Sequence, residues 1–268
     1  MISKKYYTHI SLCSVLILIL IGTYFYTMYK ESFQNSNVET SVIPLKIFQT
    51  FGTKNLPKEI KTLVNRVQQE NPEFEYYLFD DNDCRAFIQE HFDEDVVNAY
   101  DTLVPGAFKA DLWRLCVLYI HGGMYMDIKL RNADGVKLIS LTDKEYFVRD
   151  MDGIGGGQKG VYNAFMVAKP KNPKIRDAID LIVHNVQTRF YGINPLDPTG
   201  PNLLKNVFTE QEIDAFDMYL TPKDANEKYL YIDIEGKHII CLDKSVYTSY
   251  KTKTKTYHDH WMERTMYK

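Results

Sequence analysis

The residues that offer the clearest chemistry lie in one block, PGAFKADLWRLCVLYIHGGMYMDIKLR, at positions 105–131. Asp111 and Arg114 are three residues apart in a predicted helix, so their side chains share one face. The pair Gly122-Gly123 then allows a tight turn into a short strand that ends on Asp127. Because ligands of open α/β sheets bind beyond the carboxyl ends of strands, these charged side chains are expected to converge on one crevice. The alternative interpretation is an ordinary surface ion pair beside a strand-end aspartate.

The elements that must position this block alternate between strand-like and helix-like patterns. Strands are expected at 45–51, 74–79, 124–128, 146–150 and 163–169, with short strands and turns after 218. Helices are expected at 57–70, 83–91, 93–101, 105–121 and 173–190, with another opening at Gly200-Pro201. This alternation predicts an α/β domain with a mainly parallel central sheet.

The N-terminal segment differs from the rest of the chain. No Asp, Glu, Lys or Arg occurs from Tyr6 to Tyr29, and a helix of that length rises about 36 Å, enough to cross a hydrocarbon core of roughly 30 Å. Two lysines precede the segment, and the positive-inside bias then sends the remainder across the membrane. The predicted organisation is a cytoplasmic tail (1–9), a transmembrane signal anchor (10–29), a stem (30–44) and a catalytic domain (45–268). A cleaved signal peptide is the competing interpretation.

Overall composition excludes several classes of protein. The 268 residues contain 32 Lys and Arg against 35 Asp and Glu, a formal net charge of −3, so no basic excess favours nucleic-acid binding. Only 4 cysteines are present, which excludes a disulfide scaffold. A site for an anionic ligand must therefore concentrate positive charge locally.

The block at 105–131 resembles the DXD-containing sugar-binding region of glycosyltransferase family 32. That region approximates A-x-x-[SA]-D-x-x-R-x-x-x-L-x-x-x-G-G-x-Y-x-D-x-D, and the positions that match in order are Ala107, Asp111, Arg114, Leu118, Gly122, Gly123, Tyr125 and Asp127. The segments IPLKIFQTFGTKNLP, NAFMVAKPKNP, DPTGPNLL and HDHWMER are similar to further motifs of the family. The resemblance covers nearly all of residues 43–265.

The resemblance implies a GT-A fold, Rossmann-like and typical of nucleotide-diphospho-sugar transferases. It also implies retaining transfer of a hexose from a UDP- or GDP-sugar to a glycan, lipid or protein hydroxyl, on the lumenal side of a Golgi- or ER-type membrane. By resemblance the catalytic candidates are Asp111, Arg114 and Asp127. The expected donor-binding residues are Gln49, Thr50, Asp111, Arg114, Tyr125, Asp127, Lys129, Asn163, Gly200 and Trp261.

The chain departs from the family pattern at the last position of the motif, where Asp127-Ile128-Lys129 replaces D-x-D. In one interpretation the ammonium of Lys129 supplies the positive charge that a leaving nucleoside diphosphate needs. In a second, Mn²⁺ or Mg²⁺ still binds through Asp127, phosphate oxygens and a residue of the tail, with His258 the best candidate. In a third, activity is lost and the chain is a catalytically silent nucleotide-sugar-binding module.

Overall fold

A computed structural model describes residues 15, 17, 19–28, 41–151, 160–221, 229–243 and 255–268. The chain divides into two compact units, Met1–Ser41 and Val42–Lys268. In the first unit, residues 19–28 are helical and exposed. Among the residues that the structure describes, no helix combines the length and the apolar character needed to cross a membrane.

The second unit is built on one sheet, whose strand order is β2-β1-β3-β6-β5-β7-β8-β9-β4 over the described residues. The strands are β1 (Lys46–Thr50), β2 (Glu75–Phe79), β3 (Gly123–Met126), β4 (Leu130–Asn132), β5 (Tyr146–Arg149), β6 (Val161–Ala168), β7 (Met218–Leu220), β8 (Tyr229–Ile234) and β9 (Lys237–Asp243). The pairs β2–β1, β1–β3 and β5–β7 are parallel, whereas the other neighbours pair antiparallel.

The prediction of a mainly parallel sheet is therefore wrong, because the sheet is mixed. One reason is β6, which runs antiparallel to both β3 and β5. Another is the two-residue turn Glu235-Gly236, where both residues have positive φ (50° and 76°). Such a turn joins adjacent strands as a hairpin, which makes β8 and β9 antiparallel.

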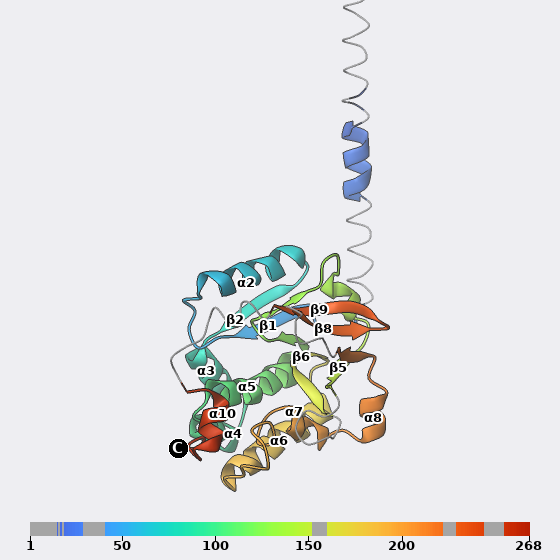
Figure 1. Ribbon diagram of the computed structural model, residues 1–268. Coiled ribbons are helices and arrows are strands. Elements are labelled where there is room, and N and C mark those ends of the chain that lie inside the picture. Colours follow the sequence, from blue (N-terminus) through green and yellow to red (C-terminus); the bar gives the residue numbers. More distant parts are fainter. Residues whose placement is uncertain are drawn as a thin grey trace, which may run out of the picture. The chain divides into compact units, whose positions relative to one another are not determined.

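Helices cover both faces of the sheet (Figure 1). They are α2 (Lys58–Glu70), α3 (Asp81–His91), α4 (Glu94–Thr102), α5 (Gly106–His121), α6 (Pro173–Gln187), α7 (Pro201–Lys205), α8 (Glu210–Asp214) and α10 (Tyr257–Met262), with a 3₁₀ turn at Leu138–Leu141. On β1, Phe48 packs into the core shared with α3–α7, whereas its neighbour Ile47 packs into the core on the opposite face. Because successive side chains of a strand point to opposite faces of the sheet, β1 contributes to the apolar cores on both faces.

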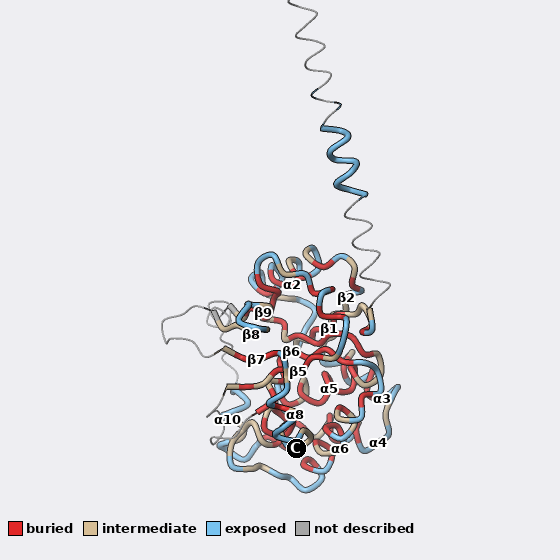
Figure 2. The backbone as a smooth tube through the Cα atoms, turned by 90° about the vertical axis from the view of Figure 1, so that its right-hand side faces the viewer, coloured by how far each residue is buried: buried red, intermediate tan, exposed pale blue. Residues whose placement is uncertain are grey.

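Helix α5 is largely buried, and Figure 2 shows it surrounded by the rest of the fold. Its buried residues are Phe108 and every residue from Asp111 to Leu118. Both charged side chains of that stretch, Asp111 and Arg114, are therefore buried. Trp113 and Leu112 contact no solvent at all. The helix that carries the expected site residues is therefore held on all sides, which fixes their positions.

The turn from α5 into β3 needs glycine at both of its positions. Gly122 has φ 61° and Gly123 has φ 102°, in the region that favours glycine. A Cβ atom on Gly123 would lie 2.7 Å from the backbone oxygen of Lys46, and one on Gly122 would lie 2.6 Å from Pro170. This close packing brings β3 beside β1 and sets the point at which the strand ends, just before Asp127.

Candidate active site

Arg114 lies at the centre of the cluster that the sequence pattern predicted. Its Nη2 lies 2.9 Å from Oδ1 of Asp111, its Nη1 lies 3.3 Å from Oδ1 of Asp127, and Nη1 also donates to the backbone oxygen of Asn163 at 2.7 Å. The guanidinium stacks over the ring of Tyr125 at 4.5 Å. Only 5% of the Arg114 side chain is exposed, so the alternative of a surface ion pair is wrong.

Asp111 is buried and has a hydrogen-bond donor on each carboxylate oxygen. Asn163 Nδ2 donates to Oδ1 at 2.9 Å, and Thr199 Oγ1 donates to Oδ2 at 2.8 Å. Burial raises the pKa of Asp111 to about 6, against the opposing effects of Arg114 and these donors. Because three elements converge on this carboxylate, its orientation is defined before any ligand arrives.

Asp127 differs from Asp111 in exposure. Its side chain is 42% exposed, while Oδ1 accepts a hydrogen bond from the Tyr125 hydroxyl at 2.7 Å. Gln49 is fully buried; its Nε2 donates to the backbone oxygen of Asp127 at 3.3 Å and its Oε1 accepts from Tyr76 at 2.6 Å. Gln49 and Tyr125 therefore hold the strand end, and Asp127 presents a carboxylate to solvent.

Two neighbouring cavities open at Asp127. The smaller, about 220 Å³, is lined by Asp111, Arg114 and Asn163 together with residues 195–196 and 200–201. The larger, about 470 Å³, is lined by Lys129 and by residues 255–257 of the chain's tail. Ala107, Asp127, Tyr162 and Tyr257 line both, so the two cavities adjoin, and together they are called the cleft. Its volume suits a small-molecule ligand.

The lining residues of the cleft that were not predicted from sequence include Tyr162, Lys255 and Tyr257. Lys255 is the last lysine of the KTKTKT stretch, whose simplest interpretation is a solvated loop, and its ammonium also pairs with Glu263. Tyr257, the first residue of α10, packs against Phe108 with ring centroids 5.7 Å apart. No local pattern brings a tail residue to Asp127; only the tertiary fold does.

The larger cavity carries positive charge. Lys129 and Lys255 line it, whereas Asp127 is the carboxylate in its wall. Partial burial lowers the pKa of Lys129 from its ordinary value, although the nearby Asp127 acts in the opposite direction. Arg114 next door is balanced by Asp111 and Asp127, and Lys255 pairs with Glu263, so Lys129 is the cation of the cleft most directly available to an anionic ligand in this interpretation.

The structure places the other predicted residues around the cleft or away from it. Gly200 lines the smaller cavity at the start of α7. Thr50 lines a separate cavity of about 130 Å³ and donates to the backbone oxygen of Phe79 at 3.0 Å. Trp261 packs against the core, and its Nε1 donates to the backbone oxygen of Tyr191 at 2.6 Å. It lines neither cavity of the cleft.

The donor set of the cleft does not fit a divalent metal held by the protein alone. Mn²⁺ and Mg²⁺ prefer several hard oxygen ligands, but Asp127 is already paired with Arg114 and is followed two residues later by a lysine. His258 is exposed, stacks against Trp261 with centroids 6.3 Å apart, and lines neither cavity. No group of three or more His, Cys, Asp or Glu able to hold a metal occurs among the described residues.

Comparison with known proteins defines the class to which this chain belongs. Residues 57–133 match the profile of the glycosyltransferase sugar-binding region containing the DXD motif. This range contains α5, β3, Asp111, Arg114 and Asp127. The charged cluster therefore lies within the part of the chain that matches this glycosyltransferase profile.

Relatives identify the family more closely. The chain is 29% identical to the initiation-specific alpha-1,6-mannosyltransferase of Candida albicans over 36% of this chain and 27% of that protein. It is 30% identical to inositol phosphoceramide mannosyltransferase 2 of Schizosaccharomyces pombe (54% and 39%) and 30% identical to the uncharacterized glycosyltransferase L373 of Acanthamoeba polyphaga mimivirus (63% and 66%). These matches support the resemblance to glycosyltransferase family 32 at the level of the family. The chain spans roughly a quarter to two fifths of the two fungal relatives.

Solved structures with a similar chain trace are also glycosyltransferases. The PaToxG glycosyltransferase is 18% identical with a TM-score of 0.48, covering 70% of this chain and 77% of that one. The glycosyltransferase domain of the YGT toxin is 11% identical with a TM-score of 0.42, covering 63% and 78%.

Proposed function

We propose that this chain is a retaining glycosyltransferase of the GT-A type, which moves a hexose from a nucleotide-sugar to an acceptor hydroxyl. The observation that carries the proposal is the array of buried Asp111 and Arg114 with half-exposed Asp127 in the wall of an open cleft. The match to the family profile supports the same conclusion. Retention of configuration and the GT-A assignment follow from the resemblance to the family.

Each of the two cavities of the cleft suits one part of a nucleotide-sugar donor. The larger cavity suits the diphosphate, because Lys129 and Lys255 can neutralise the charge that develops on the leaving nucleoside diphosphate. The smaller cavity suits the sugar, because the carboxylates of Asp111 and Asp127 accept hydrogen bonds from hydroxyl groups. Arg114 lies between them and holds both carboxylates in place.

Mannose is the favoured sugar. Both fungal relatives described above are mannosyltransferases by name, so we propose GDP-mannose as the first donor to test, ahead of UDP-glucose and UDP-galactose. The acceptor is a glycan, a lipid or a protein.

The lysine at position 129 bears on the role of a metal. We propose that Lys129 carries the positive charge directly and that turnover does not require Mn²⁺ or Mg²⁺. The alternative is a metal bound by Asp127, the donor phosphates and His258, and the donor set described above does not favour it. Replacement of the second aspartate also favours a second candidate function, a nucleotide-sugar-binding module without turnover.

The N-terminal segment is proposed to anchor the enzyme as a single-pass type II membrane protein with its catalytic domain on the non-cytoplasmic side. The basis is the uncharged run from Tyr6 to Tyr29, preceded by Lys4 and Lys5. Half of this run lies outside the described residues, and the proposal rests on the sequence alone.

The full-length chain, incubated with GDP-mannose, UDP-glucose and UDP-galactose in turn, tests the function. We expect release of nucleoside diphosphate from one donor, and loss of that release in Asp127→Asn. Binding of a donor without release would instead favour the silent module. Absence of both binding and release for every donor would contradict the proposed function.

A further inference from the structure

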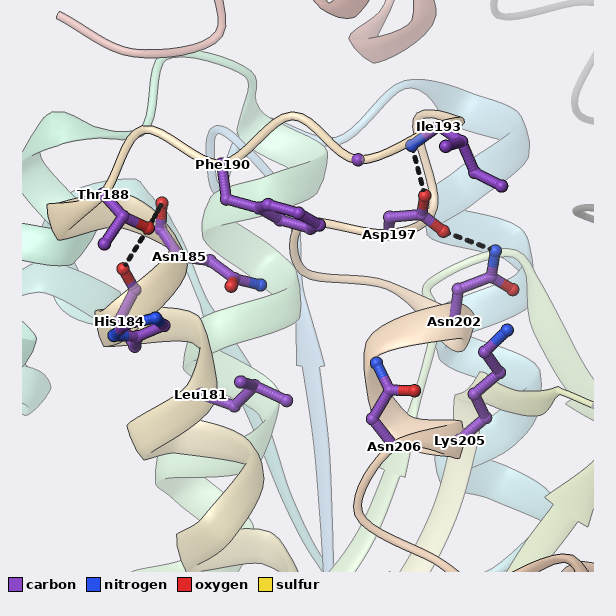
Figure 3. A pocket seen from close by; sticks show the side chains of 11 residues that line it. Leu181, His184, Asn185, Thr188, Phe190, Ile193, Asp197, Asn202, Lys205 and Asn206 are labelled. Atoms are coloured by element: carbon purple, nitrogen blue, oxygen red, sulfur yellow. Dashed lines mark hydrogen bonds between the residues drawn. The ribbon is translucent and has the colours of Figure 1, made fainter.

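A cavity of about 820 Å³ lies between the C-terminal half of α6, the segment 188–197 and α7 (Figure 3). It is larger than either cavity at Asp127 and shares no lining residue with them. Nothing in the proposed donor site uses it.

The outer wall of this cavity is shaped by Asp197. Its Oδ2 accepts from the backbone nitrogens of Ile193 at 2.7 Å and Asn194 at 3.1 Å, while Oδ1 accepts from Asn202 Nδ2 at 2.7 Å. Gly192 has φ 64°, and a Cβ atom there would lie 2.4 Å from Asp197. The chain's own hydrogen bonds therefore form the wall, so the cavity is present without a ligand.

The lining combines an apolar surface with groups that hydrogen-bond to neutral ligands. Phe190 is 44% exposed and reaches in from one side together with Leu181 of α6. Asn206 and Lys205 approach from α7 on the opposite side, and His184 lies on α6. An aromatic face opposite amide and ammonium donors suits a saccharide, whose ring presents apolar C–H faces and hydroxyl edges.

The cavity and the sugar-binding cleft lie on two sides of one segment. Leu196 and Gly200 line the cleft, whereas Asp197 between them lines the cavity. Asn185 in the cavity donates to the Pro198 oxygen at 2.9 Å, and the next residue, Thr199, is the one that donates to Asp111. A ligand in the cavity is therefore held against the same segment that orients the Asp111 carboxylate.

From this placement we infer that the cavity is a binding site for a neutral glycan, the part of the acceptor that lies beyond the reacting hydroxyl. The inference rests on the proposed function and narrows its acceptor to a glycan or a glycan-bearing molecule. The glycan packs on Phe190, hydrogen-bonds to Asn206 just after α7, and extends past the 195–196 segment toward the cleft.

Kinetics with a defined acceptor test the inference. With α-1,6-mannobiose as acceptor, Phe190→Ala and Asn206→Ala should each raise the acceptor KM about tenfold, the effect of losing one good contact. Donor hydrolysis without acceptor should stay unchanged, because neither residue lines the cleft. Gln187→Ala is the matched control, since Gln187 is exposed on the same helix end but does not line the cavity.

A binding measurement provides a second readout that needs no turnover. Trp261 donates to the Tyr191 oxygen beside the cavity wall, and the other tryptophan, Trp113, is fully buried in α5. Titration of the full-length chain with α-1,6-mannobiose should therefore change tryptophan fluorescence saturably, and Phe190→Ala should weaken that response about tenfold.

Failure of this inference differs from failure of the proposed function. If donor hydrolysis is normal but Phe190→Ala leaves both the acceptor KM and the fluorescence titration unchanged, the glycan site is contradicted while the transferase stands. If no donor is hydrolysed, the proposed function fails, and the saccharide titration still decides whether the cavity binds glycan.

Discussion

The guanidinium of Arg114 joins two elements by lying 3.3 Å from the carboxylate of Asp127 at the end of β3. The same group lies 2.9 Å from Asp111, one helical turn earlier on α5. One buried cation therefore holds a buried and a half-exposed carboxylate, and only the latter opens to both cavities of the cleft.

The variant Asp127→Asn is expected to lower activity without destabilising the fold. Asp127→Asn keeps the shape of the side chain and its contact with Tyr125, but it removes the negative charge that faces the cleft. We expect kcat/KM for transfer to fall about 100-fold or more, the usual effect of losing one oriented charged group. The melting temperature should change little, because 42% of this side chain is exposed.

Arg114→Ala is the contrasting variant. It leaves the buried carboxylate of Asp111 without its cation, which should destabilise the fold by about 3–5 kcal/mol as well as abolish transfer. Thermal and urea unfolding of the two variants measure this difference. Equal unfolding free energies for both variants would contradict the structural role assigned to Arg114.

Activity should depend on pH through Asp111. Burial raises the pKa of this carboxyl to about 6, so it is ionised at pH 7 and protonated at pH 5. We expect kcat/KM for transfer to decrease as the pH falls through 6, because the protonated group no longer holds Arg114. The pH profile of kcat/KM checks the expectation: the wild type should show this decrease, and Asp111→Asn should lack it.

The contribution of Asp111 to the unfolding free energy should change with pH in the direction opposite to its effect on activity. Because the folded pKa is above the ordinary 3.8, the folded chain binds this proton more tightly than the unfolded chain. The contribution of Asp111 is therefore greatest below pH 4 and decreases as the pH rises to about 6, by about 3 kcal/mol in all. The unfolding free energy of wild type minus that of Asp111→Asn should fall over this range; a constant difference would contradict it.

The variant Gly192→Ala tests the wall that Asp197 forms in the cavity of about 820 Å³. Gly192→Ala places a Cβ atom 2.4 Å from Asp197, whereas Gly135→Ala introduces a residue at φ 80° with nothing within 4 Å. Both substitutions should cost about 1–2 kcal/mol of backbone strain, but only the first also displaces Asp197. We therefore expect a clearly lower melting temperature for Gly192→Ala than for Gly135→Ala.

The membrane anchor has its own test. The full-length chain should remain with membranes after alkaline carbonate extraction. Leu20→Lys should release part of it, because a lysine at the centre of a spanning helix costs roughly 2.5–3.5 kcal/mol. Leu20→Ile is the matched control. Recovery of the wild-type chain in the soluble fraction would contradict the anchor.

The central part of the site was predictable from sequence because its signals are local. Asp111 and Arg114 share a helix face by their spacing, and Gly122-Gly123 marks the turn that leads to Asp127. The structure adds the burial of the cluster, which depends on packing of α5 against its neighbours. The spacing left a surface ion pair open, and burial removes that alternative.

Strand direction and the remote half of the cleft were not predictable in the same way. Alternating helices and strands suggested a mainly parallel sheet, but the direction of β6 depends on which neighbours it joins. Tyr162 and Tyr257 come to Asp127 from distant parts of the chain. The role of Thr199 likewise depends on a contact across 88 residues of sequence.

The most direct measurement is donor hydrolysis by the full-length chain in the presence and absence of EDTA, with wild type and Lys129→Met compared. If Lys129 and its cationic neighbours neutralise the leaving diphosphate, EDTA will leave wild-type turnover essentially unchanged, and Lys129→Met will lower it about 100-fold. Complete loss of wild-type turnover with EDTA, restored by added Mn²⁺, would contradict that account.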